Sequence, residues 1–83
     1  MTDFIRLGDT TDHGGKIISA SLTMSYDSIP VARKGDRITC LLHPQIQPNV
    51  IVEGDESITD DGVPVARHNH RGTCGCHLIS SLR

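Results

Sequence analysis

Histidine and cysteine are the side chains of this 83-residue chain with the clearest capacity for chemistry. The eight candidates are His13, Cys40, His43, His68, His70, Cys74, Cys76 and His77. Cys40 and His43 have C-x-x-H spacing, and His70 stands four residues before Cys74. Imidazole nitrogen and thiolate sulfur are the donors that zinc prefers, usually in a closed tetrahedral arrangement at structural sites. The residue types therefore predict a metal site that joins distant segments of the chain.

The residues alone leave several of these candidates open. His68 lies in a polar run and is expected to face solvent, while His77 precedes an apolar pair and is expected to be packed or exposed. Cys76 is suited to a small buried apolar position and also to competing for the metal as a thiol. A C-x-x-H pair can use its histidine alone, so the role of Cys40 stays open, as does the choice between zinc and iron.

A catalytic metal is not predicted. Such a site keeps an open coordination position and usually has a carboxylate base nearby. The chain has no H-E-x-x-H or H-x-E…P-C-x-x-C motif, no P-loop and no G-x-S-x-G. Its acidic residues gather between Glu53 and Asp61, and this composition is typical of a solvated turn region. We therefore expect that the protein is not an enzyme.

An internal repeat relates the metal-capable positions to one another. Residues 30–40 read PVARKGDRITC and residues 64–74 read PVARHNHRGTC, so seven of these eleven positions are identical. A degenerate third copy begins with Arg6-Leu7-Gly8-Asp9 and places His13 at the repeat position of Cys40 and Cys74. Because equivalent positions in a repeat occupy equivalent places in a fold, we expect three similar arms to bring these side chains together.

The elements that must position these residues are short strands and turns. No window has a helical period, so we predict an all-β fold with little or no helix. Strands are expected over residues 17–24, 38–42 and 50–53, and a loop over 43–48, where two prolines occur. Asp61-Gly62 between extended residues predicts a hairpin, because both central turn positions need positive φ.

Length and composition indicate one small domain, residues 1–83, with a thin core. Phe4 and Tyr26 are the only aromatic residues. Domains of this size bury a modest share of their surface and usually need a disulfide, a metal or a partner. The odd number of cysteines favours metal ligation over disulfides if the chain is made in a reducing compartment.

The charge pattern and the beginning of the chain limit the partners and the location that we expect. The net charge of −2, with no basic stripe, argues against nucleic acid as a partner. No apolar run approaches the roughly 20 residues of a membrane span. Residues 1–4 lack the features of a secretory signal. We therefore expect a protein made in the cytoplasm and exported, if at all, by another carrier.

The motifs, taken in order, resemble those of a known family. They are the run from Gly8 to Gly15, the two Pro-Val-Ala-Arg copies, Thr39-Cys40-x-x-His43, Ile51-Val52-Glu53-Gly54, and His70-Arg71-x-Thr73-Cys74-Gly75-x-x-Leu78-Ile79-Ser80. Together they resemble the PAAR-repeat proteins, the spike-tip family of type VI secretion systems. The resemblance spans about residues 6–82. One departure is the run 67–70, where Arg-His-Asn-His stands in place of Arg-x-Gly-Asp.

For structure, the resemblance implies a small three-sided cone of short strands and hairpins, stapled by one structural zinc near its apex. The family binds this zinc through three histidines and one cysteine. Carried over by motif, these ligands are His13, His43, His70 and Cys74. His70 would then occupy the aspartate position of the last repeat. Apolar residues expected in the core or at the base of the cone are Ile17, Ile18, Leu22, Val50, Ile51, Val63 and Val65.

For function, the resemblance implies a tip that caps and sharpens the trimeric β-helical VgrG-type spike, one tip per trimer. Such a tip leaves the cell on the spike, contacts a target membrane transiently and can help attach effectors. We expect a stand-alone tip without an effector extension. The alternative is a small zinc-binding adaptor that recruits a separate effector to a scaffold, and a metallohydrolase is a third, less favoured, class.

Overall fold

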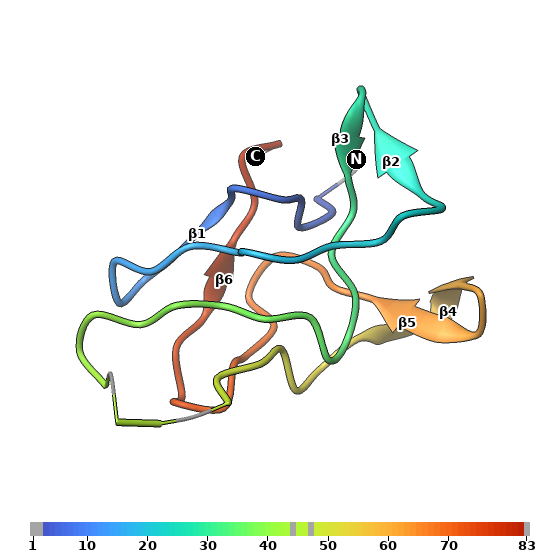
Figure 1. Cartoon of the computed structure of the whole chain (residues 1–83). Coiled ribbons are helices and arrows are strands. Elements are labelled where there is room, and N and C mark those ends of the chain that lie inside the picture. Colours follow the sequence, from blue (N-terminus) through green and yellow to red (C-terminus); the bar gives the residue numbers. More distant parts are fainter. Residues whose placement is uncertain (1–2, 44, 47, 83) are drawn as a thin grey trace.

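The computed structural model describes residues 3–43, 45–46 and 48–82 (Figure 1), and this part of the chain is all-β, as predicted. The strands are β1 (Thr10–Thr11), β2 (Ser25–Tyr26), β3 (Ile29–Pro30), β4 (Asp55–Asp60), β5 (Val63–Val65) and β6 (Leu78–Ile79). None of the described residues is helical. Within those ranges the chain therefore has no helix long and apolar enough to cross a membrane.

The six strands form three antiparallel pairs. β2 pairs with β3, and β4 pairs with β5. The turn between β4 and β5 is Asp61-Gly62, with φ of 55° and 82°, which confirms the hairpin predicted there. In the third pair β1 joins β6, with Thr11 opposite Leu78. This pair joins the beginning of the chain to its end, and Thr11–Leu78 corresponds in the repeat to the isolated bridges Ile17–Ile38 and Ile51–Gly72.

A closed ring of backbone hydrogen bonds lies at the centre of the fold. Ile5 N donates to Ala66 O (3.0 Å), Ala66 N donates to Ala32 O (3.0 Å), and Ala32 N donates to Ile5 O (2.7 Å). All three residues are fully buried. Each directly precedes the first arginine of its repeat copy (Arg6, Arg33 or Arg67), so the ring relates the three arms by a pseudo-threefold axis.

The same relationship extends outward from the ring. Each repeat arginine is followed by a residue whose N–H bonds to the next arm, and the three pairs are Leu7 to Pro30 (2.8 Å), Lys34 to Pro64 (2.9 Å) and His68 to Asp3 (3.0 Å). Isolated bridges join Phe4 to Arg67, Arg6 to Val31, and Arg33 to Val65 in the same cyclic order. The degenerate first copy is thus a structural repeat as well.

A small apolar core surrounds this axis. It consists of Ile5, Ile17, Ala32, Ile38, Ile51, Ala66, Cys76 and Leu78. Among the apolar residues singled out from the sequence, Ile17, Ile51 and Val65 are buried, whereas Ile18 and Leu22 are exposed. Val50 and Val63 are half-buried.

Three of the predicted elements are not regular strands. Residues 17–24, 38–42 and 50–53 contribute only isolated bridges, at Ile17 with Ile38, Arg37 with Val50, and Ile51 with Gly72. Each segment pairs at one or two positions and then crosses to the next arm, so no ladder can lengthen. In the predicted loop, His43, Gln45, Ile46 and Pro48 lie outside strands, and Pro44 and Gln47 lie outside the described residues.

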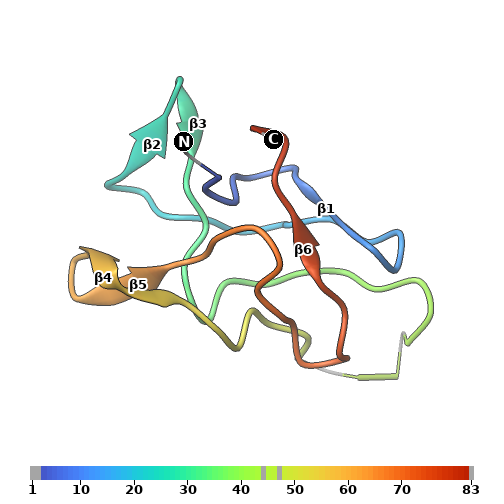
Figure 2. The ribbon, with the colours of Figure 1, turned by 180° about the vertical axis from the view of Figure 1, so that it is seen from behind.

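The two hairpins and the turns that contain His13, Cys40 and Cys74 lie at different ends of the molecule. In Figure 1 and in the reverse view of Figure 2, β2–β3, β4–β5 and both chain ends gather on one side. The turns after β1, after residue 38 and before β6 gather on the other. The hairpin side is called the base and the opposite side the apex.

Candidate metal centre

Four metal-capable side chains meet at the apex. They are His13, Cys40, His43 and Cys74, and one ligand atom from each lies within 4.8 Å of all the others. Cys40 Sγ is 3.6 Å from His13 Nδ1 and 3.6 Å from His43 Nδ1, and Cys74 Sγ is 3.9 Å from His13 Nδ1. Cys40 is buried and the other three are half-buried. The four groups are therefore close enough to bind a single metal ion.

Three of the four residues come from the pseudo-threefold repeat. His13, Cys40 and Cys74 each stand seven positions after the first arginine of their copy. The residue before each uses a side-chain oxygen to accept a backbone N–H from a neighbouring segment. These acceptor and donor pairs are Asp12 with His77 (2.8 Å), Thr39 with Lys16 (2.9 Å) and Thr73 with Val50 (3.2 Å). Repeated hydrogen bonds thus hold the three positions around the axis.

The fourth residue, His43, departs from the repeat. It follows Cys40 by three residues, and its carbonyl accepts the N–H of Ile46 at 3.1 Å. The rings of His13 and His43 have their centroids 5.2 Å apart and are tilted by 50°. The segment after Cys40 therefore turns back and brings His43 against the three repeat positions.

The surroundings of Cys74 favour its thiolate. Burial opposes ionisation, but hydrogen bonds from the Asn49 amide (3.4 Å), from the Cys76 backbone and from the thiols of Cys76 and Cys40 outweigh it. Together they lower the pKa of Cys74 from its ordinary 9.0 to about 6. A thiolate is the form of cysteine that binds metal. Sequence reasoning missed Asn49, because a buried amide beside a thiol has no sequence signature.

Cys76 has the opposite character. It is fully buried in the core cluster, as suits a small apolar residue. Burial, with the neighbouring Cys74, raises the pKa of the Cys76 thiol to about 12. Its sulfur is not among the atoms that meet at the apex. Cys76 therefore packs the core beneath the cluster.

His70 is not brought to this cluster, although the motif carry-over placed it among the ligands. Its Nδ1 instead accepts the backbone N–H of Arg67 at 2.9 Å. That bond closes the turn within the repeat copy of residues 64–74, so the ring nitrogen faces the turn. Cys40 occupies the fourth place, so the structure assembles two cysteines and two histidines where three histidines and one cysteine were expected.

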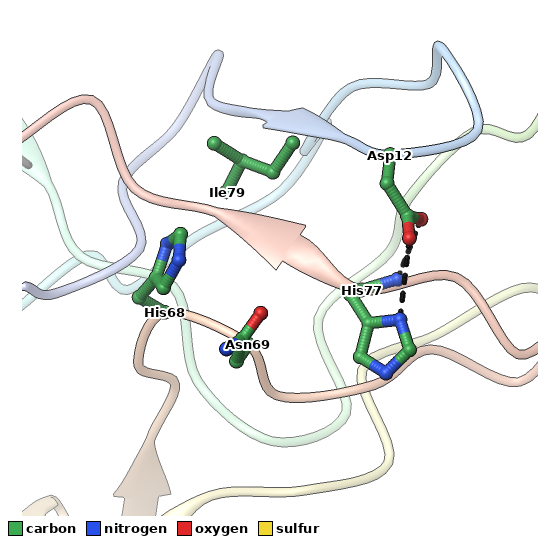
Figure 3. A pocket seen from close by; sticks show the side chains of 5 residues that line it. All are labelled: Asp12, His68, Asn69, His77 and Ile79. Atoms are coloured by element: carbon green, nitrogen blue, oxygen red, sulfur yellow. Dashed lines mark hydrogen bonds and ion pairs between the residues drawn. The ribbon is translucent and has the colours of Figure 1, made fainter.

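His68 and His77 also lie outside the cluster. They line a cavity of about 510 Å³ together with Asp12, Asn69 and Ile79 (Figure 3). His68 Nδ1 accepts the N–H of Ser80 at 3.1 Å, and the His77 ring lies 3.2 Å from Asp12. The backbone N–H of His77, assisted by its ring, holds the pKa of Asp12 below its ordinary value. These histidines join segments of the fold.

The fold and the cluster define a small all-β domain with pseudo-threefold arms and a metal-capable apex. The PAAR motif family model matches residues 7–80 of the chain. The chain therefore belongs to the PAAR motif family, which is associated with the spike of type VI secretion systems. The comparison with curated proteins found no match.

Proposed function

We propose that this protein caps a trimeric VgrG-like spike as its zinc-stabilised tip, one copy per trimer. The observation that carries the proposal is the ring of Ile5, Ala32 and Ala66, because it gives a single chain three equivalent arms. A threefold partner can meet such a chain with one subunit on each arm. Family membership supports the spike as that partner.

The base has features that suit docking on the spike. β2–β3 and β4–β5 are two-stranded hairpins. Pro30 of β3 and Pro64 of β5 already accept N–H groups from neighbouring arms, so among the described residues β2 and β4 have the outer edges. An open strand end of a β-helical partner can add to such edges. Leu22, Tyr26 and Ile29 lie at or next to β2–β3 and are 100%, 39% and 37% exposed. We therefore assign the base to the spike interface.

Zinc is the metal that we propose for the apex. With zinc–sulfur bonds of about 2.3 Å and zinc–nitrogen bonds of about 2.0–2.1 Å, tetrahedral ligands stand roughly 3.3–3.8 Å apart. The three separations of 3.6, 3.6 and 3.9 Å are close to that range. Two thiolates also neutralise the charge of a divalent ion. The binding free energy would add to a thin core, because an unfolded chain has no preformed site.

A structural role follows from this ligand set. Four protein ligands fill a tetrahedral zinc and leave no position for a reacting water. We therefore propose a mechanical part and not an enzyme. In this account the protein is made in the cytoplasm, leaves the cell on the spike and contacts the target membrane with its apex. Effectors would attach to the assembled tip.

Co-purification with a trimeric VgrG-like protein, followed by native mass measurement, tests the proposal. We expect one chain per trimer. Leu22→Asp at the base should weaken the complex strongly, and Leu41→Asp at the apex, the matched control, should not. Binding at three chains per trimer, or equal effects of both variants, would overturn the cap geometry. Binding to an effector without any spike would select the adaptor.

A further inference from the structure

Two adjacent leucines are exposed at the apex. Leu41 and Leu42 stand between the cluster residues Cys40 and His43, and they are 76% and 64% exposed. Large apolar side chains this exposed are common singly. Here two are consecutive, and both ends of their loop are fixed at the cluster. The position of Cys40 and His43 in the cluster therefore leaves both leucine side chains exposed.

The sequence around these leucines has no charged residue. Residues 38–52 contain no Asp, Glu, Lys or Arg, although the whole chain has 18 of them in 83 residues. Charged side chains are the most expensive groups to bring into a bilayer. A segment without charges can approach lipid hydrocarbon without that cost.

Other apolar side chains continue this surface. Ile18 is 53% exposed and, with Ile46, lines a cavity of about 210 Å³ beside Cys40 and His43. Leu41 also lies over the turn that follows His13, because its Cδ1 is 3.6 Å from the position that a Cβ on Gly14 would take. Ile18 and Leu41 thus add apolar surface on one side of the cluster, beside the polar Thr39 and Asn49 that line the same cavity.

We propose that Leu41 and Leu42 bind the boundary between the headgroups and hydrocarbon of a lipid bilayer, without any thrust from the spike. The inference rests on the proposed function only for how the apex reaches a membrane. Residues 40–43 lie outside strands and have no strand edge for a protein to extend. An exposed, uncharged loop instead suits a lipid bilayer, because fluid lipids can rearrange around the two side chains. Because the cluster already holds both ends of the loop, little ordering is needed on binding.

A single tryptophan reports on this contact, because the chain has no other. Leu42→Trp is mixed with vesicles of phosphatidylcholine, with and without bromine on the acyl chains. We expect its emission to shift to the blue and to be quenched by the brominated lipid. Leu22→Trp at the base is the matched control and should show neither change. An unresponsive Leu42→Trp, or the same response from both variants, would overturn the proposal.

A second experiment replaces both leucines and measures how the variant partitions into vesicles. Leu41→Ser combined with Leu42→Ser should lower the vesicle partition coefficient at least about tenfold, since each leucine loses its apolar area. Melting temperature and metal content should stay at the parent values. An unchanged partition coefficient would contradict the inference. The spike assay separates the two proposals, because a chain that binds the trimer but ignores vesicles refutes only the lipid contact.

Discussion

The backbone N–H of Arg67 donates a hydrogen bond of 2.9 Å to Nδ1 of His70. In the other two repeat copies an aspartate accepts this bond from the arginine three positions earlier, Asp9 at 2.8 Å and Asp36 at 2.7 Å. His70 therefore replaces a carboxylate as the acceptor that closes the turn. The substitution keeps the hydrogen bond, and the four side chains at the apex come together without His70.

His70→Asp should keep the fold, because it restores the acceptor that the other two copies use. His70→Ala should destabilise the protein by roughly 1 kcal/mol, since it leaves the Arg67 N–H without its partner. Both variants should bind as much metal as the parent. Thermal melting and metal analysis of the three proteins check this expectation. Loss of metal from His70→Asp would return His70 to the ligand set.

Cys40 and Cys76 offer a second contrast, because both are buried thiols and only Cys40 reaches the cluster. Cys40→Ala should abolish stoichiometric metal binding. Cys76→Ala should keep the metal and cost roughly 1–2 kcal/mol for a small core void. Metal content after gel filtration, with denaturant melts, measures both effects. Equal metal loss in the two variants would contradict the assignment of Cys40.

Gly15 lies at the apex, where two arms pack closely against each other. A Cβ at this position would stand 1.8 Å from the Thr39 carbonyl oxygen, next to Cys40. Gly15→Ala should therefore force the arms apart, cost about 3 kcal/mol or more, and weaken metal binding. Gly35 is the control, since a Cβ there meets open space at a φ of 94°. Gly35→Ala should cost about 1–2 kcal/mol of backbone strain. Equal losses in denaturant melts would refute the packing argument.

The repeat in the sequence predicted much of this architecture. The two Pro-Val-Ala-Arg copies and the weaker copy at Arg6 indicated three arms, and the ring through Ile5, Ala32 and Ala66 has that symmetry. The all-β class and the Asp61-Gly62 hairpin followed from local turn chemistry. Residues 17–24, 38–42 and 50–53 did not form the strands predicted for them, because each segment pairs at only one or two positions before it changes arm.

The candidate site was partly predictable. The repeat placed His13, Cys40 and Cys74 at one equivalent position, and the structure brings all three together. The motif carry-over chose His70 over Cys40, although His70 stands where the other copies have an aspartate. His70 stands four residues before Cys74, and its ring accepts the N–H of Arg67 in the turn between them and the ring of backbone bonds. Only the three-dimensional pairing of the arms distinguishes the two.

The stability of the fold should depend on pH through the carboxylate of Asp60. Hydrogen bonds from Ser21 and Thr23, with help from Arg33, lower the pKa of Asp60 below its ordinary 3.8. A depressed carboxyl pKa stabilises the fold above the ordinary pKa, and this contribution is lost as pH falls through the folded value. Asp60→Asn should therefore be less stable than the parent at pH 7, with the difference shrinking below pH 3.8. Denaturant melts of both proteins at a series of pH values measure it, and a constant difference would contradict it.

The central claim is that one metal ion at His13, Cys40, His43 and Cys74 clamps three arms of a thinly cored chain. The most direct test measures zinc per chain and the melting temperature before and after exhaustive chelation. The account predicts one zinc per chain, and a large fall in melting temperature on chelation that zinc alone reverses. A metal-free protein whose melting is unchanged by chelator and by added zinc would contradict it.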